Sequence, residues 1–193
     1  MSEAILKNNF IKIIFNQIKN NLKKLISLFS ILIILLFIYL FYISLQKKNT
    51  IKLAEQYTEA TVQFKQKKIS ESKLLLENII NKNHKFYSPL ALYFIIDNNL
   101  EKDELKIIKF FDKILKIRTI DKENLNLIKI KKAIFLFNDG EEGSIIKTLK
   151  PVINSDSIWR NIAIKMMADY FLSKDQKTKA NEYIQLLNNK ISK

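Results

Sequence analysis

The strongest pattern along the chain is a long run without charged side chains. It covers residues 25–46, between Lys24 and Lys47, and reads LISLFSILIILLFIYLFYISLQ. As an α-helix this run is about 33 Å long, which matches a bilayer hydrocarbon core of about 30 Å. A buried helix of a soluble domain needs only about 15 residues and keeps a polar face. The run therefore predicts a single transmembrane helix.

The flanks of this run predict an uncleaved anchor. A cleavable signal peptide has a short basic start, an apolar stretch of about 7–15 residues and a small-x-small exit, whereas here 24 residues come first and the exit is bulky. Five lysines precede the run and three follow it within residues 1–52, a bias that favours a cytoplasmic amino terminus and a periplasmic carboxyl-terminal part. The predicted topology and interface anchors are Lys23, Lys24, Tyr39 and Tyr42.

Residues 1–24 form a basic segment that is predicted to be cytoplasmic. Apolar residues repeat there at steps of three and four, and the lysines lie mostly elsewhere on the helical wheel. This pattern fits an amphipathic helix on the inner leaflet, with its lysines facing anionic headgroups. It fits equally a continuous extension of the anchor helix or an unstructured tail.

Residues 47–193 show helical spacing throughout. Apolar positions recur at steps of three, four and seven, and alternation with a period of two is not sustained anywhere. The stripes predict eight helices, centred on 53–64, 75–80, 87–95, 107–115, 127–137, 145–152, 158–170 and 180–187. The stripe of the fifth helix includes Ile134 as a predicted core position, and that of the seventh includes Ile158 and Ile162.

Short polar corners between these helices predict antiparallel pairs. The pairs begin near residues 51, 87, 123 and 158, which gives spacings of 36, 36 and 35 residues. A helix hairpin of about 34 residues is the tetratricopeptide unit, which stacks on its neighbours to form a solenoid. Ser88 and Pro89 are predicted to cap and begin the second of these hairpins. The predicted class is all-α, with one transmembrane helix and about four hairpins.

The composition excludes several kinds of functional site. The chain of 193 residues has no Cys, 2 Gly and a single His. Disulfides, cysteine metal sites and glycine-rich phosphate loops are therefore excluded, and tight β-turns are disfavoured. We predict no cofactor, no metal and no enzymatic activity. Asp103, Glu104, Glu141, Glu142 and Asp169 have no partner motif and are interpreted as solvated or helix-start carboxylates.

The positive charge is spread along the chain. Lys and Arg total 33 against 19 Asp and Glu, a net charge of +14, yet only Arg118 and Arg160 are arginines. Nucleic-acid recognition favours clustered arginines, so we predict no nucleic-acid partner. His84 is interpreted as a solvated loop histidine and Trp159 as a core residue.

Small and aromatic residues at the predicted helix crossings resemble a known family. They are Tyr57, Ala60 and Phe64; Tyr87, Leu90 and Ala91; Trp159, Ala163 and Ala168; and Asp175, Lys179, Ala180 and Tyr183. Together with the anchor, this pattern resembles bacterial single-pass inner-membrane proteins with a periplasmic tetratricopeptide-like domain, the ancillary subunits of the Sec translocon. The sequence departs from the pattern at Ser72 and Lys73, where Ala is usual, and in lacking most corner glycines.

Two classes of function compete on this pattern. The first is a membrane-anchored scaffold for protein interactions, for which the resemblance implies the Sec translocon and periplasmic chaperones as partners. Its repeat-packing residues would be Ala60, Ala91, Ala163, Ala168 and Ala180. The second is a basic helical domain that binds an anionic polymer or a lipid surface. The partner-binding residues and the oligomeric state stay open at this point.

Overall fold

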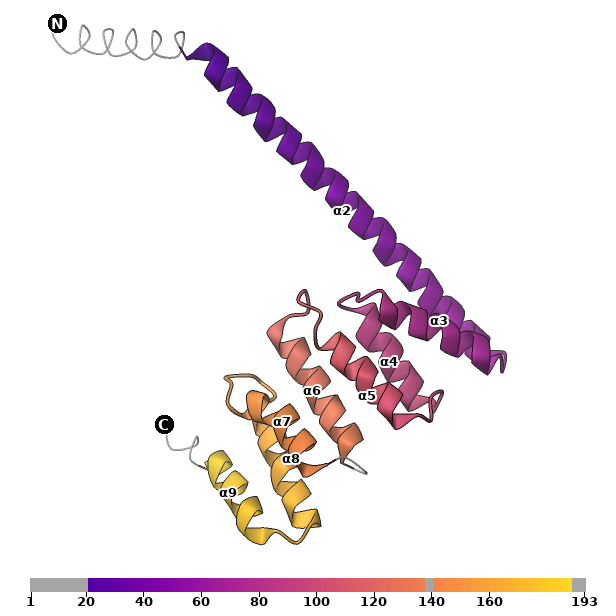
Figure 1. Ribbon diagram of the computed structural model, residues 1–193, viewed down its shortest axis with the longest axis vertical. Helices are drawn as coiled ribbons and strands as arrows, with labels where there is room; N and C mark the ends of the chain where they lie inside the picture. Colours follow the sequence, from indigo (N-terminus) through magenta and orange to yellow (C-terminus); the bar gives the residue numbers. More distant parts are fainter. Residues whose placement is uncertain (1–20, 138–140, 189–193) are drawn as a thin grey trace, which may run out of the picture. The chain divides into compact units, whose positions relative to one another are not determined.

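The computed structural model describes residues 21–137 and 141–188, and all regular structure in them is α-helical (Figure 1). The prediction of an all-α chain is therefore confirmed. The chain divides into two compact units, one ending at Lys52 and one beginning at Leu53. The second unit is named the helical domain below. The helices are α2 (Leu22–Lys65), α3 (Ile69–Asn81), α4 (Tyr87–Asp97), α5 (Glu104–Ile114), α6 (Lys122–Leu136), α7 (Glu142–Ile153), α8 (Arg160–Ser173) and α9 (Lys177–Asn188).

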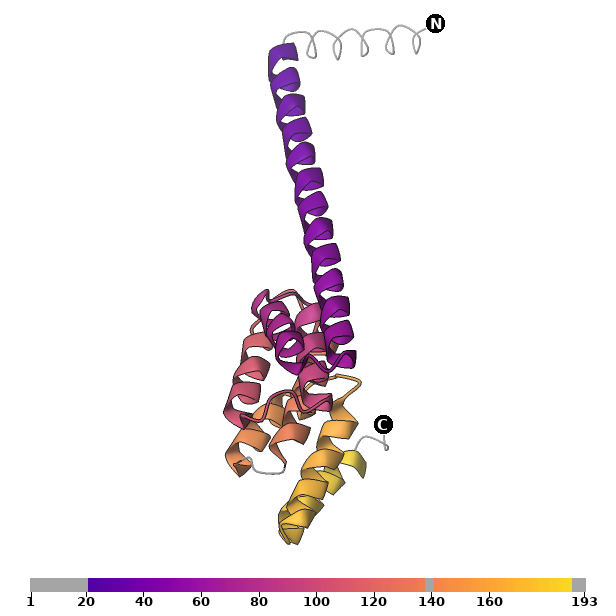
Figure 2. The same ribbon diagram turned by 90° about the vertical axis from the view of Figure 1, so that its right-hand side faces the viewer.

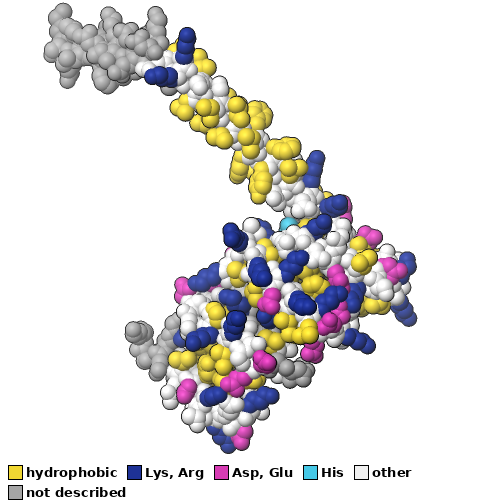
Figure 3. All heavy atoms as spheres, in the orientation of Figure 1, with side chains coloured by type: hydrophobic (Ala, Val, Ile, Leu, Met, Phe, Trp, Pro, Cys, Tyr) yellow, Lys and Arg dark blue, Asp and Glu magenta, His cyan; other side chains and the backbone are white. Residues whose placement is uncertain are grey.

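The apolar run lies in α2, a single helix of 44 residues. Its described side chains from residue 26 to 49 are all exposed, and hydrophobic groups cover the visible side of this stretch between lysines near its ends (Figure 3). Backbone groups are satisfied within the helix, and the Ser30 hydroxyl donates to the Ile26 carbonyl at 2.9 Å. Among the described residues α2 is the one helix that is long and apolar enough to cross a membrane.

The predicted anchors are described on this helix, whereas most of the preceding segment is not. Lys23 and Lys24 are exposed in the first turn of α2, and Tyr39 and Tyr42 are exposed further along it. The surface helix proposed for residues 1–24 falls mainly on residues 1–20, which lie outside the described residues.

The first repeat helix is continuous with the apolar run in α2. No Gly, Pro or turn motif stands between residues 46 and 53, so nothing there terminates a helix. The Thr50 hydroxyl donates to the Gln46 carbonyl at 2.8 Å and follows the helical pattern. The predicted boundary at 46/47 therefore falls inside α2.

From α3 to α9 each helix packs against the next one along the chain. The end of α2 pairs with α3, α4 with α5, α6 with α7, and α8 with α9 (Figures 1 and 2). The first helices of the later pairs begin at residues 87, 122 and 160. These positions are within two residues of the starts that the sequence spacing predicts.

The apolar stripes form two core clusters. The first runs from Leu53 to Ile128, and the second from Ile130 to Ala180, so that α6 contributes to both. The five alanines predicted at helix crossings are all buried: Ala60, Ala91, Ala163, Ala168 and Ala180. Small side chains at these places allow neighbouring helices to approach closely.

Some predicted core positions are wrong. Ile134, Ile158 and Ile162 are 56%, 75% and 44% exposed, respectively. In α8 the buried stripe is formed instead by Ala163, Ile164, Met167, Ala168, Tyr170 and Phe171. A helix that packs against neighbours on two sides has a wide apolar arc, and periodicity does not show where that arc ends.

The predicted cap at Ser88 is also wrong. Helix α4 begins at Tyr87, and Ser88 is fully buried in its first turn. The Ser88 hydroxyl donates to the Ile79 carbonyl at 3.0 Å and accepts from the His84 backbone N–H at 2.9 Å. It therefore connects α3 to α4 rather than capping α4.

Four of the described corners place a residue other than glycine in the left-handed region. Lys67, Asn83, Asn99 and Asp175 have φ values of 63°, 53°, 51° and 57°. At Lys67 the following N–H, that of Lys68, donates to the Gln63 carbonyl at 2.9 Å, which is the Schellman arrangement. Asparagine tolerates this conformation, whereas a lysine is strained by its Cβ.

Replacing Lys67 with glycine is therefore expected to stabilise the helical domain by about 0.5–1 kcal/mol, because relief of this strain exceeds the added chain entropy of the unfolded state. The measurement is the midpoint of urea unfolding. Lys68→Gly is the matched control, since Lys68 has a φ of −86°. An equal gain in both variants would contradict the strain argument.

Candidate binding surface

An apolar pocket opens at the surface between the first helices of the second and third hairpins. Its volume is about 140 Å³, and it is lined by Lys85, Phe86, Pro89, Leu90, Tyr93, Asn124, Leu127 and Ile128. Cavities of about this size hold a single aromatic ring. The pocket can therefore take one large apolar side chain of a partner.

Tyr93 forms one wall of this pocket. Burial raises the pKa of its hydroxyl to about 12, so the phenol stays neutral and acts as a hydrogen-bonding group with an apolar ring. The Lys131 ammonium lies 4.5 Å from the ring centroid, in a cation–π contact between α6 and α4. The contact places a positive charge beside the apolar pocket.

Further apolar side chains on or next to the first helices of the hairpins are exposed or half-buried. Phe86, before α4, is 60% exposed. On α6, Leu127 and Ile134 are seven residues apart and share a face. On the last hairpin, Ile158 and Ile162 are spaced by one turn. We name these residues, together with Leu90 and Tyr93, the apolar strip.

His84 positions the amino-terminal end of the strip. Its Nδ1 accepts from the backbone N–H groups of Phe86 and Tyr87 at 3.2 Å each, so the imidazole caps α4. Its ring also lies 5.3 Å from that of Tyr87, which lies 5.1 Å from Phe86. His84 lies in a loop as predicted, but its side chain is half-buried and holds the turn, so it is not a fully solvated residue.

This cap predicts a pH dependence. Burial, and next the Lys85 charge, lower the pKa of His84, so folding favours the neutral imidazole. Its contribution to stability is complete above the unfolded pKa, about 6.5, and is lost as pH falls through the lower folded value. We expect the urea midpoint to fall between pH 7 and pH 5. Substitution by asparagine, which caps without titrating, should remove this dependence; an unchanged slope in His84→Asn would contradict it.

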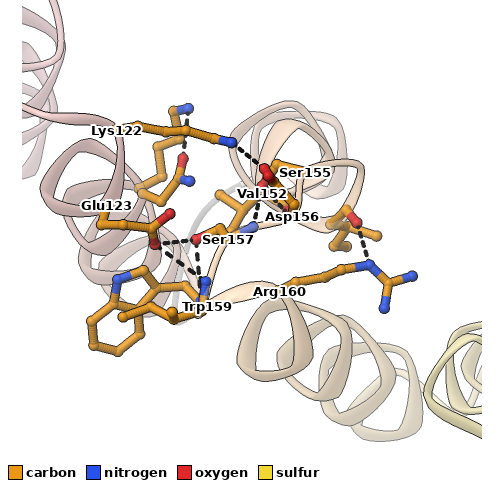
Figure 4. Close-up of polar contacts among 12 residues, drawn as sticks. Lys122, Glu123, Val152, Ser155, Asp156, Ser157, Trp159 and Arg160 are labelled. Carbon is orange, nitrogen blue, oxygen red and sulfur yellow. Dashed lines mark hydrogen bonds and ion pairs between the residues drawn. The ribbon is translucent and has the colours of Figure 1, made fainter. Parts of the chain in front are cut away.

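Polar contacts at the starts of α6 and α8 hold the third and fourth hairpins together (Figure 4). Glu123 Oε2 accepts from the Ser157 hydroxyl at 2.6 Å and from the Ile158 N–H at 3.2 Å. The Ser157 hydroxyl accepts in turn from the Trp159 backbone N–H at 3.1 Å. Lys122 pairs with Asp156. Trp159 is half-buried and packs against the second core cluster, as a core residue would.

A second polar group joins the first two hairpins. The Glu101 side chain is only 8% exposed and pairs with Lys73 at 2.9 Å and Lys106 at 3.0 Å. Hydrogen bonds from Lys73 and the Asp103 N–H lower the Glu101 pKa to about 2. Lys106 also pairs with Glu77 at 2.7 Å. This network gives Lys73 a structural role, at a position where the family that the sequence resembles usually has Ala.

The other departure, Ser72, and two of the nominated carboxylates have structural explanations. Ser72 is buried, and its hydroxyl donates to the Ala60 carbonyl at 2.8 Å, which links α3 to α2. Asp103 is the N-cap of α5 and accepts from the Lys106 N–H. Glu142 pairs with Lys179 at 2.8 Å. In the described parts of the chain no three His, Asp or Glu side chains gather as metal ligands would.

The sequence reasoning did not identify the strip. A detectable signal was the spacing of Phe86, Leu90 and Tyr93, a second apolar face on α4 besides that of Ala91 and Ile95. The chain was also compared with models of protein families, with curated proteins and with solved structures. None of the three comparisons finds a match.

Proposed function

We propose that the protein is a membrane-anchored scaffold whose apolar strip binds segments of other proteins beside a bacterial inner membrane. In this proposal α2 crosses the membrane with its amino-terminal side in the cytoplasm, and the helical domain is periplasmic. The hairpins stack as a tetratricopeptide-like solenoid. The observation that carries the proposal is an apolar pocket, open at the surface, between the first helices of neighbouring hairpins.

Contacts between neighbouring hairpins support the repeat arrangement. Ser157 bonds to Glu123 and Gln176 bonds to Glu142, both across 34 positions, and Lys179 reaches Glu142 across 37. These separations are close to the predicted period of about 35 residues. A stack of hairpins that each contact only their neighbours is the defining property of a solenoid, and the first helices of such a stack line its binding face.

The choice of partner rests on the resemblance and on the anchor. Ancillary Sec translocon subunits carry a periplasmic tetratricopeptide-like domain on one membrane helix, and we propose the translocon, with periplasmic chaperones or exported chains, as the partner. A tether raises the effective concentration of two groups to the millimolar range for short linkers. Weak recognition of single apolar side chains is sufficient under that condition.

Site-specific photocrosslinking in intact cells tests this proposal. A photoreactive residue at position 134 reports on the strip, and one at position 105 is the control, because Leu105 is equally apolar and 68% exposed on α5. We expect translocon subunits, chaperones or exported chains to be captured from position 134, and less so with Leu90→Glu. Identical products from both positions, or lipid alone from position 134, would refute the scaffold.

A further inference from the structure

Two connections of the helical domain carry positive charge without any acidic residue. Residues 82–86, between α3 and α4, contain Lys82 and Lys85, and residues 115–120, between α5 and α6, contain Lys116 and Arg118. The α2–α3 connection at 66–68 also has two lysines and no acid, whereas the α4–α5 connection at 98–103 has two acids and one lysine. The four basic side chains are exposed. We name these four side chains the basic edge.

The two connections lie together at one edge of the domain (Figures 1 and 2). Lys113 Nζ donates to Asn81 Oδ1 at 2.6 Å, which joins the end of α5 to the end of α3. A hollow of about 450 Å³ opens there, lined by Asn83, Lys113, Lys116, Ile117, Arg118 and Thr119. Lysine ammonium and arginine guanidinium groups at the rim of this hollow can bind phosphate oxygens.

The basic edge is at the end of the domain where the chain enters from the apolar run. The Tyr57 ring, one turn after Leu53, lies 6.3 Å from the ring of Tyr87, which follows the α3–α4 connection directly. Six residues, 47–52, separate the uncharged run from Leu53. Even a fully extended segment of that length spans no more than about 20 Å, so this end of the domain cannot move far from the membrane surface.

We propose that the basic edge docks onto anionic lipid headgroups of the membrane in which α2 is anchored. The four basic side chains contact the headgroup phosphates around the hollow. This docking rests on the membrane anchoring in the proposed function, but it does not depend on any protein partner. It would set the orientation of the helical domain above the bilayer.

The test uses the full chain in nanodiscs of phosphatidylcholine with or without phosphatidylglycerol. The chain has no Cys, so Thr119→Cys accepts a single fluorophore, whose quenching by headgroup spin-labelled lipid reports contact. We expect several-fold stronger quenching with phosphatidylglycerol, reduced to the phosphatidylcholine level by high salt, which shortens the Debye length to about 3 Å at 1 M. The same reduction is expected for the combined variant Lys82→Glu, Lys85→Glu, Lys116→Glu and Arg118→Glu.

A charge-matched variant at other connections is the control. It combines Lys67→Glu, Lys68→Glu, Lys102→Glu and Lys174→Glu, which are all exposed, and it should retain the quenching. Equal quenching in both lipids, or equal loss in both variants, would overturn the docking. A chain that does not enter nanodiscs at all would instead overturn the anchoring, so the two failures are distinguishable.

Discussion

Replacing Phe111 with alanine is expected to lower the free energy of unfolding of the helical domain by about 3–5 kcal/mol. The Phe111 ring is fully buried in the first core cluster, with its centroid 6.2 Å from that of Phe135 on α6. Its removal takes away contacts within the α4–α5 hairpin and with α6 of the next hairpin. Neighbouring backbones are held by their helices and cannot close the cavity.

The measurement is urea unfolding of the full chain in detergent, followed by circular dichroism. Leu105→Ala is the matched control because it removes an apolar side chain that is 68% exposed on the same helix. Exposed truncations of this kind cost less than about 1 kcal/mol. Similar losses in the two variants would show that α5 does not pack as described.

Replacing Ala180 with leucine is expected to lower the free energy of unfolding by about 1–3 kcal/mol, because it adds volume to the core rather than removing it. Ala180 is fully buried in the second core cluster, near the stacked rings of Phe171 and Tyr183, whose centroids are 5.6 Å apart. A close helix crossing cannot accept the additional volume without moving α9 away from α8. The loss should appear in the fluorescence of Trp159, which packs against the same cluster.

Asn181→Leu is the control for this variant. Asn181 follows Ala180 on α9 and is exposed, and leucine has the higher helix propensity. We expect the control to be neutral or slightly stabilising. A stable Ala180→Leu variant with unchanged fluorescence would mean that small side chains are not required at this crossing.

The sequence predicted the helices well because their signal is local. Spacings of three and four residues locate the helices between Leu53 and Leu187, and the polar corners locate the hairpins. The candidate surface was harder to predict. Leu90 and Leu127 recur at the same spacing as buried positions, and spacing alone does not show that they line a pocket at the surface. The network of Glu101 with Lys73 and Lys106 joins residues far apart in sequence, and no short-range pattern reports such pairs.

The division of the core at α6 has a consequence for the order in which the chain can fold. All buried members of the first cluster lie between Leu53 and Ile128, and those of the second between Ile130 and Ala180. Synthesis proceeds from the amino terminus, and contacts between adjacent hairpins form rapidly because they close short loops. A nascent chain that has emerged through α6 already contains everything its first core needs. The remaining hairpins then add to a preformed surface, so little apolar area stays exposed while the protein is being made.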